Sequence, residues 1–180
     1  MCSQRFSFPL VHVALIIMGV NVFACQSIRH IEEDGLKHVK IGMAMPGPGA
    51  KQVKKYPLRD TTLTEGGYEW YAQIYNYGEG EVWVESDFFG EDRVNRIRVQ
   101  AADLFVKGSG KLRVGSRVEE LKAIHQRWQV SYLADYGFYD LIDPGQSRIH
   151  YLVNAPDSPD PDPQLADLDA GAQVVAIVIM

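Results

Sequence analysis

His38-Val39-Lys40-Ile41-Gly42-Met43 and Lys111-Leu112-Arg113-Val114-Gly115-Ser116 are the two stretches that decide the fold. In each stretch apolar and basic residues alternate before a glycine, which is typical of a short strand that ends at a turn. The equivalent residues Ile41 and Val114 lie 73 residues apart. A pattern that recurs at such a distance indicates an internal duplication, so the segments that follow the two stretches should also match.

The second stretch is followed by a helix signal. Ser116-Arg117-Val118-Glu119 has the order of a capping box, in which a serine hydroxyl and a glutamate carboxylate bond the free amides of the first turn. Val118, Leu121 and Ile124 then place apolar groups on one helix face. Further along, the pattern predicts a hairpin of strands over 138–142 and 148–153, and a last buried strand over 173–179.

The first stretch is followed by a weaker helix signal. Met45-Pro46-Gly47-Pro48-Gly49 cannot be helix interior, because proline lacks the amide and glycine is costly there. One or two helical turns between residues 49 and 55 are therefore the most that we expect. Alternating residues over 68–75, 81–85 and 94–99 then predict a three-stranded antiparallel meander.

Each half thus reads as strand, glycine turn, helix and about three antiparallel strands. We predict an α+β fold of duplicated helix-plus-meander units, with the helices packed on one face of the sheet. The first repeat is placed at 38–106 and the second at 107–180. The second repeat contains an acidic Pro/Asp loop over 154–170, in which alternating prolines favour an extended, solvated chain over a metal site.

The first 24 residues differ from the rest of the chain. Arg5 is the only charged residue in this segment, and the run from Phe8 to Ala24 is nearly all apolar, broken by His12 and Asn21. A basic start, an apolar stretch and small residues at its end are the layout of a secretory signal. We predict that residues 1–24 are a signal peptide and that residues 25–37 form the N-terminus and tether of the mature protein.

The end of this leader, Val22-Phe23-Ala24-Cys25-Gln26, resembles a lipobox. The Cys25 thiol would receive diacylglycerol, and several acyl chains together give durable membrane anchoring. Two alternatives remain open: an ordinary secretory signal cut before Cys25, and an uncleaved anchor. Gln26 lacks the retention character of an aspartate, so by resemblance we expect an outer-membrane lipoprotein that faces the periplasm or the exterior.

Bulk composition excludes some function classes. The chain has 180 residues, and its 23 acidic against 18 basic residues give a net charge of −5. An acidic balance disfavours nucleic acid as a partner, since nucleic-acid binding calls for a basic patch. Cys2 would leave with the leader, so the mature domain would hold no disulfide and depend on its core for stability.

The repeated unit resembles a known module. The residues that carry the resemblance are Val39-Lys40-Ile41-Gly42-Met43, and Leu112-Arg113-Val114-Gly115-Ser116 with Val118-Glu119-Glu120-Leu121. They are similar to the helix-plus-sheet module of the SmpA/OmlA outer-membrane lipoproteins, and in tandem to the β-lactamase inhibitor proteins. The proline-rich stretch after Met43 departs from that pattern. The resemblance implies a non-enzymatic accessory to outer-membrane assembly or an inhibitor of a hydrolase.

Catalytic and metal-binding residues are not evident in the sequence. We expect structural roles for the mature histidines, which are His30, His38, His125 and His150. No serine lies in a Gly-x-Ser-x-Gly turn, and the acidic loop lacks the spacing of a calcium site. We therefore predict no enzyme activity, no cofactor and no metal, with a hydrolase that uses His150 or Asp140 as a remaining alternative.

A surface prediction follows from strand alternation. If Trp70 and Ile74 face the core, then Tyr71 and Tyr75 face outward. By the same reasoning Trp83 and Tyr139 also face outward, so that Tyr71, Tyr75, Trp83 and Tyr139 would share one exposed aromatic face. Aromatic side chains are enriched at protein interfaces. We predict a membrane-tethered module that binds an envelope protein through these residues; the alternative is a carbohydrate or peptidoglycan binder that stacks them on sugar rings.

Overall fold

The computed structural model describes residues 30–46, 58–87, 92–124, 127–157 and 159–180. The main element of these residues is an eight-stranded sheet with strand order β4-β5-β6-β7-β12-β11-β10-β9. Its strands are β4 (Leu58–Glu65), β5 (Tyr68–Tyr77), β6 (Gly80–Ser86), β7 (Val94–Val99), β9 (Gln129–Leu133), β10 (Phe138–Ile142), β11 (Ile149–Asn154) and β12 (Val174–Ile179).

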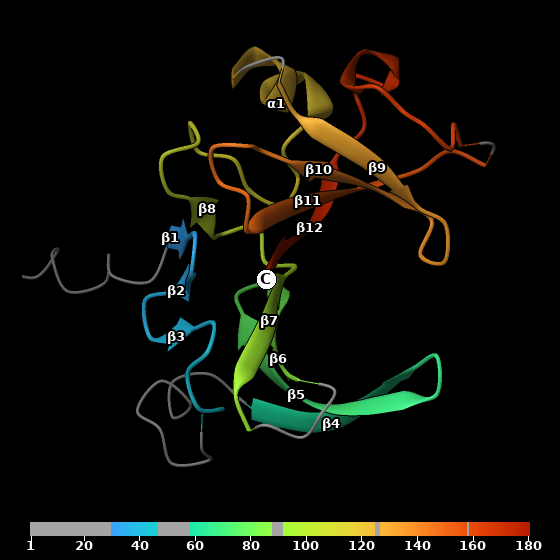
Figure 1. Ribbon diagram of the computed structural model, residues 1–180. Coiled ribbons are helices and arrows are strands. Elements are labelled where there is room, and N and C mark those ends of the chain that lie inside the picture. Colours follow the sequence, from blue (N-terminus) through green and yellow to red (C-terminus); the bar gives the residue numbers. More distant parts are fainter. Residues whose placement is uncertain (1–29, 47–57, 88–91, 125–126, 158) are drawn as a thin grey trace, which may run out of the picture.

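The large sheet consists of two four-stranded meanders. β4 to β7 form one, β9 to β12 form the other, and the last strands of the two, β7 and β12, pair antiparallel at the centre. Figure 1 shows the green meander and the orange-to-red meander meeting at β7 and β12 and spreading apart toward their other ends. The order is that of two similar units related by a twofold axis between β7 and β12.

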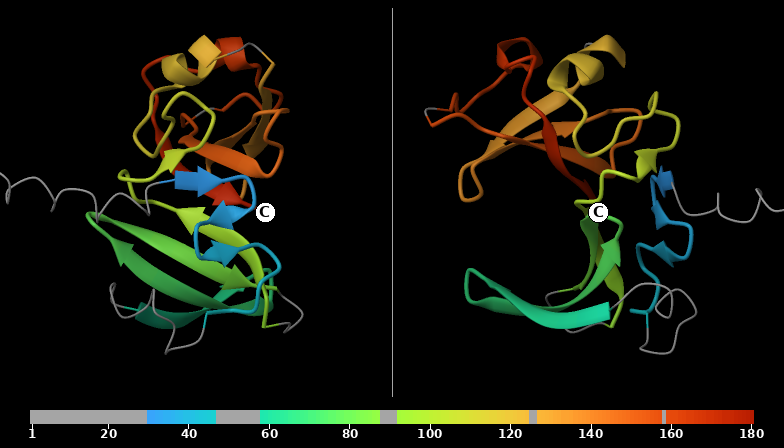
Figure 2. Two further views of the ribbon diagram at one scale, coloured as in Figure 1. Left: turned by 90° about the vertical axis from the view of Figure 1, so that its left-hand side faces the viewer. Right: turned by 180° about the vertical axis from the view of Figure 1, so that it is seen from behind.

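A smaller sheet and one helix complete the described fold. The smaller sheet has the order β3-β2-β1-β8, with β1 (His30–Glu32), β2 (Gly35–Leu36), β3 (Val39–Lys40) and β8 (Phe105–Val106). Figures 1 and 2 show its strands β1 to β3 in blue, beside β6 and β7 of the large sheet. The helix α1 (Val118–Ile124) buries Val118 and Leu121 in the core, and a short 3₁₀ turn, η1 (Leu165–Asp167), buries Leu165.

Two glycines occupy matching places in the two halves. Gly42 has φ 81° and donates its amide to the Val94 carbonyl at 2.7 Å, at the start of β7. Gly115 has φ 90° and donates its amide to the Val174 carbonyl at 2.7 Å, at the start of β12. The glycines of the two sequence stretches thus take matching positions beside β7 and β12. The first stretch contains β3, whereas the second stretch, also predicted to be a short strand, forms none. The proposed domain limits at 38–106 and 107–180 remain predictions.

The strand register assigns side chains to two faces of the large sheet, because directly paired residues point to the same side. One row of paired residues runs through the core cluster: Tyr75, Val82, Val99, Ile177, Tyr151, Leu141 and Val130. We call this side the core face. The neighbouring row crosses all eight strands on the opposite side: Arg59, Ile74, Trp83, Arg98, Val178, His150, Ile142 and Gln129. We call this side the second face.

The predicted α+β fold class is wrong. In the described residues strands dominate, and α1 is a single helix of seven residues, so no layer of helices packs on the sheet. The helical turn expected at 49–55 lies outside the described residues. The capping box also differs, because the Arg117 amide bonds the Glu120 carboxylate at 2.9 Å and not that of Glu119. The described helices include none that is long and apolar enough to cross a bilayer.

The strand predictions fared better. The meander over 68–99 is confirmed as β5 to β7, the hairpin as β10 and β11, and the last strand as β12. Two strands of the large sheet went unpredicted, β4 and β9, and they are its two edges. The short strands β1, β2 and β8 of the smaller sheet also went unpredicted. For β4 a signal was present, since its threonine-rich sequence is followed by Gly66-Gly67, a hairpin-type pair between β4 and β5.

Candidate functional site

The four aromatic residues predicted to share an exposed face do not do so. Tyr75 is 3% exposed and Tyr139 is 6% exposed, and both belong to the core cluster. Tyr71 lies four residues before Tyr75 on β5, so it is also on the core face, near the end of the sheet, where it is 37% exposed. Trp83 lies on the second face and is half-buried. The predicted outward orientation of Tyr75 and Tyr139 is therefore wrong.

The error has a simple geometric origin. Tyr77 pairs with Gly80, so the turn between β5 and β6 holds two residues and Tyr75 lies opposite Val82. Residues directly opposite each other share a face, and a shift by one residue moves every side chain to the other face. Placing both Tyr75 and Trp83 on the outer face is therefore inconsistent with a two-residue turn, because Trp83 follows the partner of Tyr75 by one residue.

The second face of β5 to β7 holds a buried ion network around Glu85. This carboxylate has no exposed surface. Its Oε2 atom accepts hydrogen bonds from the Trp70 indole at 3.0 Å and from Nε of Arg96 at 2.9 Å, with a shorter bond from Arg96 Nη2. Arg98 pairs with Oε1 at 3.3 Å. One buried carboxylate thus holds two guanidinium groups and an indole in place, as a buried charge requires.

Two tryptophan rings extend this network across the face. The guanidinium of Arg96 lies 5.5 Å from the Trp70 ring centroid, and that of Arg98 lies 5.6 Å from the Trp83 centroid. Both distances are in the range of cation–π attraction. The Trp83 indole also donates to Glu81 at 2.9 Å. Because every large group in the network has two or more partners, the second face is a fixed surface in this half.

The other half of the second face carries a histidine–aspartate pair. His150 Nδ1 lies 2.8 Å from Asp140 Oδ2, and both side chains are largely buried. A Ser–His–Asp arrangement needs the histidine between the nucleophile and the carboxylate. Here Ser131 on β9 lies opposite Asp140, and His150 lies on β11 at the other side of that aspartate. The pair therefore does not form a Ser–His–Asp arrangement with Ser131.

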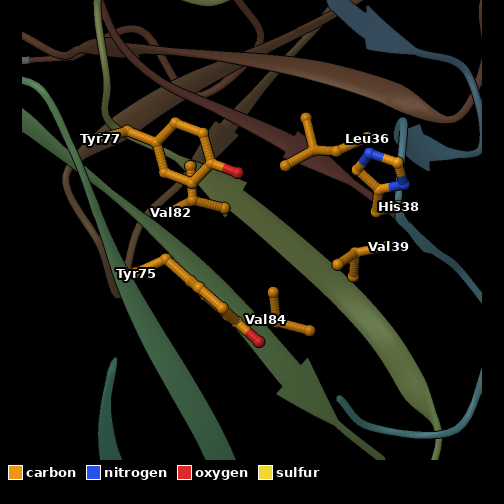
Figure 3. Close-up of a pocket in the computed structure, with 7 residues that line it drawn as sticks. All are labelled: Leu36, His38, Val39, Tyr75, Tyr77, Val82 and Val84. Carbon is orange, nitrogen blue, oxygen red and sulfur yellow. The ribbon is translucent and has the colours of Figure 1, made fainter. Parts of the chain in front are cut away.

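A small hollow under the core face is too tight for a ligand. It lies between the β2–β3 segment and strands β5 and β6, as Figure 3 shows, and its lining is Leu36, His38, Val39, Tyr75, Tyr77, Val82 and Val84. Its volume is about 10 Å³, which is room for a single water molecule. Burial raises the pKa of Tyr75 to about 12. The phenol is therefore neutral near pH 7 and cannot act there as a base.

The acidic loop shows no grouped metal ligands in its described part. The Asp167 carboxylate accepts from the Gln164 amide at 3.1 Å, and the Asp169 carboxylate accepts from the Gly171 amide at 3.0 Å. These carboxylates stabilise local turns, as aspartates commonly do in loops. No group of three or more metal-type ligands occurs among the residues that the structure describes.

Some predicted residues lie outside the described part of the chain. Cys25, the predicted lipidation site, and His125 are both in this group. The network of Glu85, Arg96 and Arg98 was not predicted, although the order of charged residues along the chain indicates it. Glu81 and Glu85 alternate on one strand while Arg96 and Arg98 alternate on the next, and opposite charges on facing strands favour cross-strand ion pairs.

Comparison with known proteins identifies a shared fold. No family model and no curated protein sequence matches this chain. The crystal structure of the uncharacterized protein yfeY from Escherichia coli is similar, with a TM-score of 0.64. The match covers 83% of this chain and 98% of that chain at 15% sequence identity. A likeness at this identity shows the fold alone.

Proposed function

We propose that this chain is a lipid-anchored protein of the bacterial cell envelope that binds a partner protein through the second face of its large sheet, without enzymatic activity. The anchoring part rests on the leader sequence and on Val22-Phe23-Ala24-Cys25-Gln26. The binding part rests on the second face. The sequence resemblance to outer-membrane assembly lipoproteins and hydrolase inhibitors suggests the two kinds of partner to look for.

The observation that carries the binding part is the centre of the second face. Trp83 and Arg98 are directly paired there, and about a third of the Arg98 side chain is exposed. Tryptophan and arginine are the residues most enriched among interface positions with large binding energies. Their positions are fixed by the network around Glu85, and a fixed side chain loses little entropy when a partner binds.

The same face suggests the chemistry of the partner. Arg98 and His150 lie on either side of Val178 in one row, two strand spacings apart, which is about 10 Å. A carboxylate placed over Val178 could accept hydrogen bonds from both side chains. We therefore expect the partner to present an aspartate or glutamate, with an apolar group beside it to contact Trp83. The carbohydrate alternative loses its main support, because Tyr75 and Tyr139 are buried.

The anchor is tested by metabolic labelling. Cells that express the full chain are supplied with radiolabelled palmitate, and the protein is compared with the Cys25→Ser variant. We expect label in the membrane-bound wild type and none in the variant. A wild-type protein that takes up no label would reject the lipoprotein proposal and leave the secreted form or the uncleaved anchor.

The binding face is tested by photo-crosslinking in cells that carry the gene. A benzophenone amino acid replaces Arg59 or Gln129, the exposed ends of the second-face row, and in the control it replaces Tyr136 on an exposed turn. We expect crosslinks to one envelope protein from both row positions and not from Tyr136. Adding Arg98→Glu should remove them, because it reverses the charge at the centre of the face. Crosslinks that persist with Arg98→Glu would contradict the proposal.

A further inference from the structure

A second candidate site lies at the other side of the molecule, beside the start of the described chain. It is an open hollow of about 630 Å³ lined by His30, Phe105, Val106, Lys107, Gly108, Gly110 and Lys111. Six of these residues come from β8 and the loop that follows it, and His30 is the first residue of β1. β1 and β8 pair in parallel, with His30 opposite Phe105, so the pairing brings the loop to the start of β1.

Hydrogen bonds to neighbouring segments hold the loop Lys107-Gly108-Ser109-Gly110-Lys111 in place. The Lys107 amide donates to the Ile31 carbonyl at 2.9 Å, and Gln146 Nε2 donates to the Lys107 carbonyl at 2.9 Å. Ser109 is buried, and its hydroxyl donates to the Val106 carbonyl at 3.2 Å. These contacts fix the loop before any ligand arrives, so binding would cost little ordering entropy.

Three residues of this loop have a left-handed backbone and amides without a backbone acceptor. Gly108, Gly110 and Lys111 all have φ between 63° and 85°, and no backbone carbonyl of the described residues accepts from their amides. Exposed amides in such a tight, partly left-handed turn form a concave site for anions. The left-handed backbone of Lys111 costs about 1 kcal/mol of strain that glycine would avoid. A lysine at such a position adds a charge beside the free amides.

The positive charge of the hollow is only partly balanced. Glu32 pairs with Lys107 at 3.3 Å and also bonds Lys40, a lysine that Asp34 balances at 2.6 Å. Hydrogen bonds from Lys40 and Lys107 lower the pKa of Glu32. Lys111 has no ion-pair partner among the described residues and is exposed. The guanidinium of Arg113 lies 5.2 Å from the Phe105 ring that lines the hollow. Lysines and an arginine therefore outnumber the carboxylate.

We propose that this hollow binds an anionic phosphate group, and that its source is a phospholipid headgroup of the membrane that holds the lipid anchor. The choice of source rests on the proposed anchoring at Cys25. His30 follows Cys25 by five residues, and five extended residues span at most about 17 Å. An anchored chain thus keeps the hollow within reach of the headgroups, where each lysine near an anionic surface contributes about 1 kcal/mol of attraction.

The test measures protection of lysines from an amine-acetylating reagent by mass spectrometry. The processed full-length protein is reconstituted into vesicles of phosphatidylcholine alone, or of phosphatidylcholine with phosphatidylglycerol. We expect Lys107 and Lys111 to react about fivefold more slowly in the vesicles with phosphatidylglycerol, the factor that about 1 kcal/mol gives. Lys37, which is exposed on the β2–β3 turn, is the control and should keep its rate. Equal slowing of all three lysines would show general surface attraction and overturn the proposal.

A second arm separates the two sources of phosphate. Inorganic phosphate is added to the same protein in phosphatidylcholine vesicles. If the protein carries no lipid and does not enter vesicles, the phosphate is added to the protein in detergent. Protection by phosphate but not by phosphatidylglycerol would keep the phosphate site and reject the lipid source. Protection by neither would overturn the proposal, whatever the state of Cys25.

A variant removes the site without threatening the fold. Lys111→Gly deletes the charge and relieves the left-handed strain, so the protein should be at least as stable as wild type. We expect it to abolish the protection of Lys107, whereas Lys37→Ala, which removes the same charge elsewhere, should leave that protection intact. Unchanged protection in Lys111→Gly would overturn the proposal.

Discussion

The two meanders use the same backbone devices and different side chains. Gly42 and Gly115 bond the first residues of β7 and β12 in the same way. Each meander also carries an irregularity at a matching place, between Glu85 and Ser86 opposite β7 and between Leu152 and Val153 opposite β12. A β-bulge of this kind increases the local twist of the strand. Turns and bulges thus set the shape of both halves.

The second face shows where the halves differ. The central pair of β7 and β12 is Arg98 with Val178, so the twofold axis places these two residues in matching positions. Trp83 then matches His150, because each is the direct neighbour of the central residue on the next strand. By the same counting, Glu85 matches Leu152. One half holds a buried ion network, and the other holds apolar residues with a single histidine–aspartate pair.

The difference separates two kinds of constraint. Backbone hydrogen bonds at the starts of β7 and β12 must be satisfied in both halves, since unpaired buried amides are costly. Side chains on the second face need only fill their own surroundings. The likeness of the two halves is therefore visible in glycine positions and strand order, while the second face can be ionic in one half and apolar in the other.

The largest expected effect comes from giving the first half the residue of the second. Glu85→Leu removes the hydrogen-bond acceptor of Arg96 and the Trp70 indole and the ion-pair partner of Arg98. We expect the free energy of unfolding in urea to fall by about 3 kcal/mol, at the lower end for a broken buried pair because both arginines reach solvent. Adding Arg96→Ala and Arg98→Val, the residues of the second half, should recover at least half of that loss. A triple variant less stable than Glu85→Leu would mean that the halves are not interchangeable.

The sequence predicts the strands of this fold better than its faces. Alternating residues located β5, β6, β7, β10, β11 and β12. β5 is buried on both sides over Ala72–Tyr75, so its polarity does not show which side meets the core. The two-residue turn at Gly78-Glu79 would have fixed that choice, since it alone sets Tyr75 opposite Val82.

The second face and the hollow depend on long-range pairing. Arg98 and His150 share a row because β7 and β11 both pair with β12, and no local pattern reports that order. The loop Lys107–Lys111 has a visible glycine and lysine pattern, but its proximity to His30 depends on the parallel pairing of β1 and β8. The predicted helix layer failed for another reason, because α1 is short and strands occupy most of the described chain.

Alkaline pH should weaken both halves through one buried tyrosine in each. Burial raises the pKa of Tyr75 and of Tyr151 to about 12 from the usual 10.0. Folding therefore favours the protonated phenol, so this stability is complete below pH 10 and is lost as the pH rises toward 12. Each tyrosine should account for about 2 kcal/mol of that loss. Tyr75→Phe and Tyr151→Phe should each remove its share of the difference in unfolding free energy between pH 9 and pH 11.5; equal pH dependence in both variants and wild type would contradict the assignment.

Matching glycines should respond alike to substitution. Gly42 and Gly115 have φ of 81° and 90°, and a Cβ atom at either position would meet nothing within 4 Å. Gly42→Ala and Gly115→Ala should therefore cost only the left-handed backbone strain, about 1 to 2 kcal/mol each. Urea unfolding of the two single variants should give the same loss within about 0.5 kcal/mol. A large difference would show that the two turns are not equivalent.

The smallest effect is expected from the acidic partner of His150. Asp140 matches Ala72 in the first half. Asp140 pairs with Leu152 and Ala72 pairs with Glu85, and Leu152 and Glu85 are matching residues. Asp140→Ala removes the partner of one histidine, whereas Glu85→Leu removes the partner of two guanidinium groups and an indole. The Oδ1 atom of Asp140 is buried without a hydrogen bond, so removing the carboxylate also relieves a desolvation cost. We expect a loss of at most about 1 kcal/mol by urea unfolding, against about 3 for Glu85→Leu. A loss as large as that of Glu85→Leu would mean that Asp140 holds more than His150, and that both halves of the second face depend on a buried carboxylate.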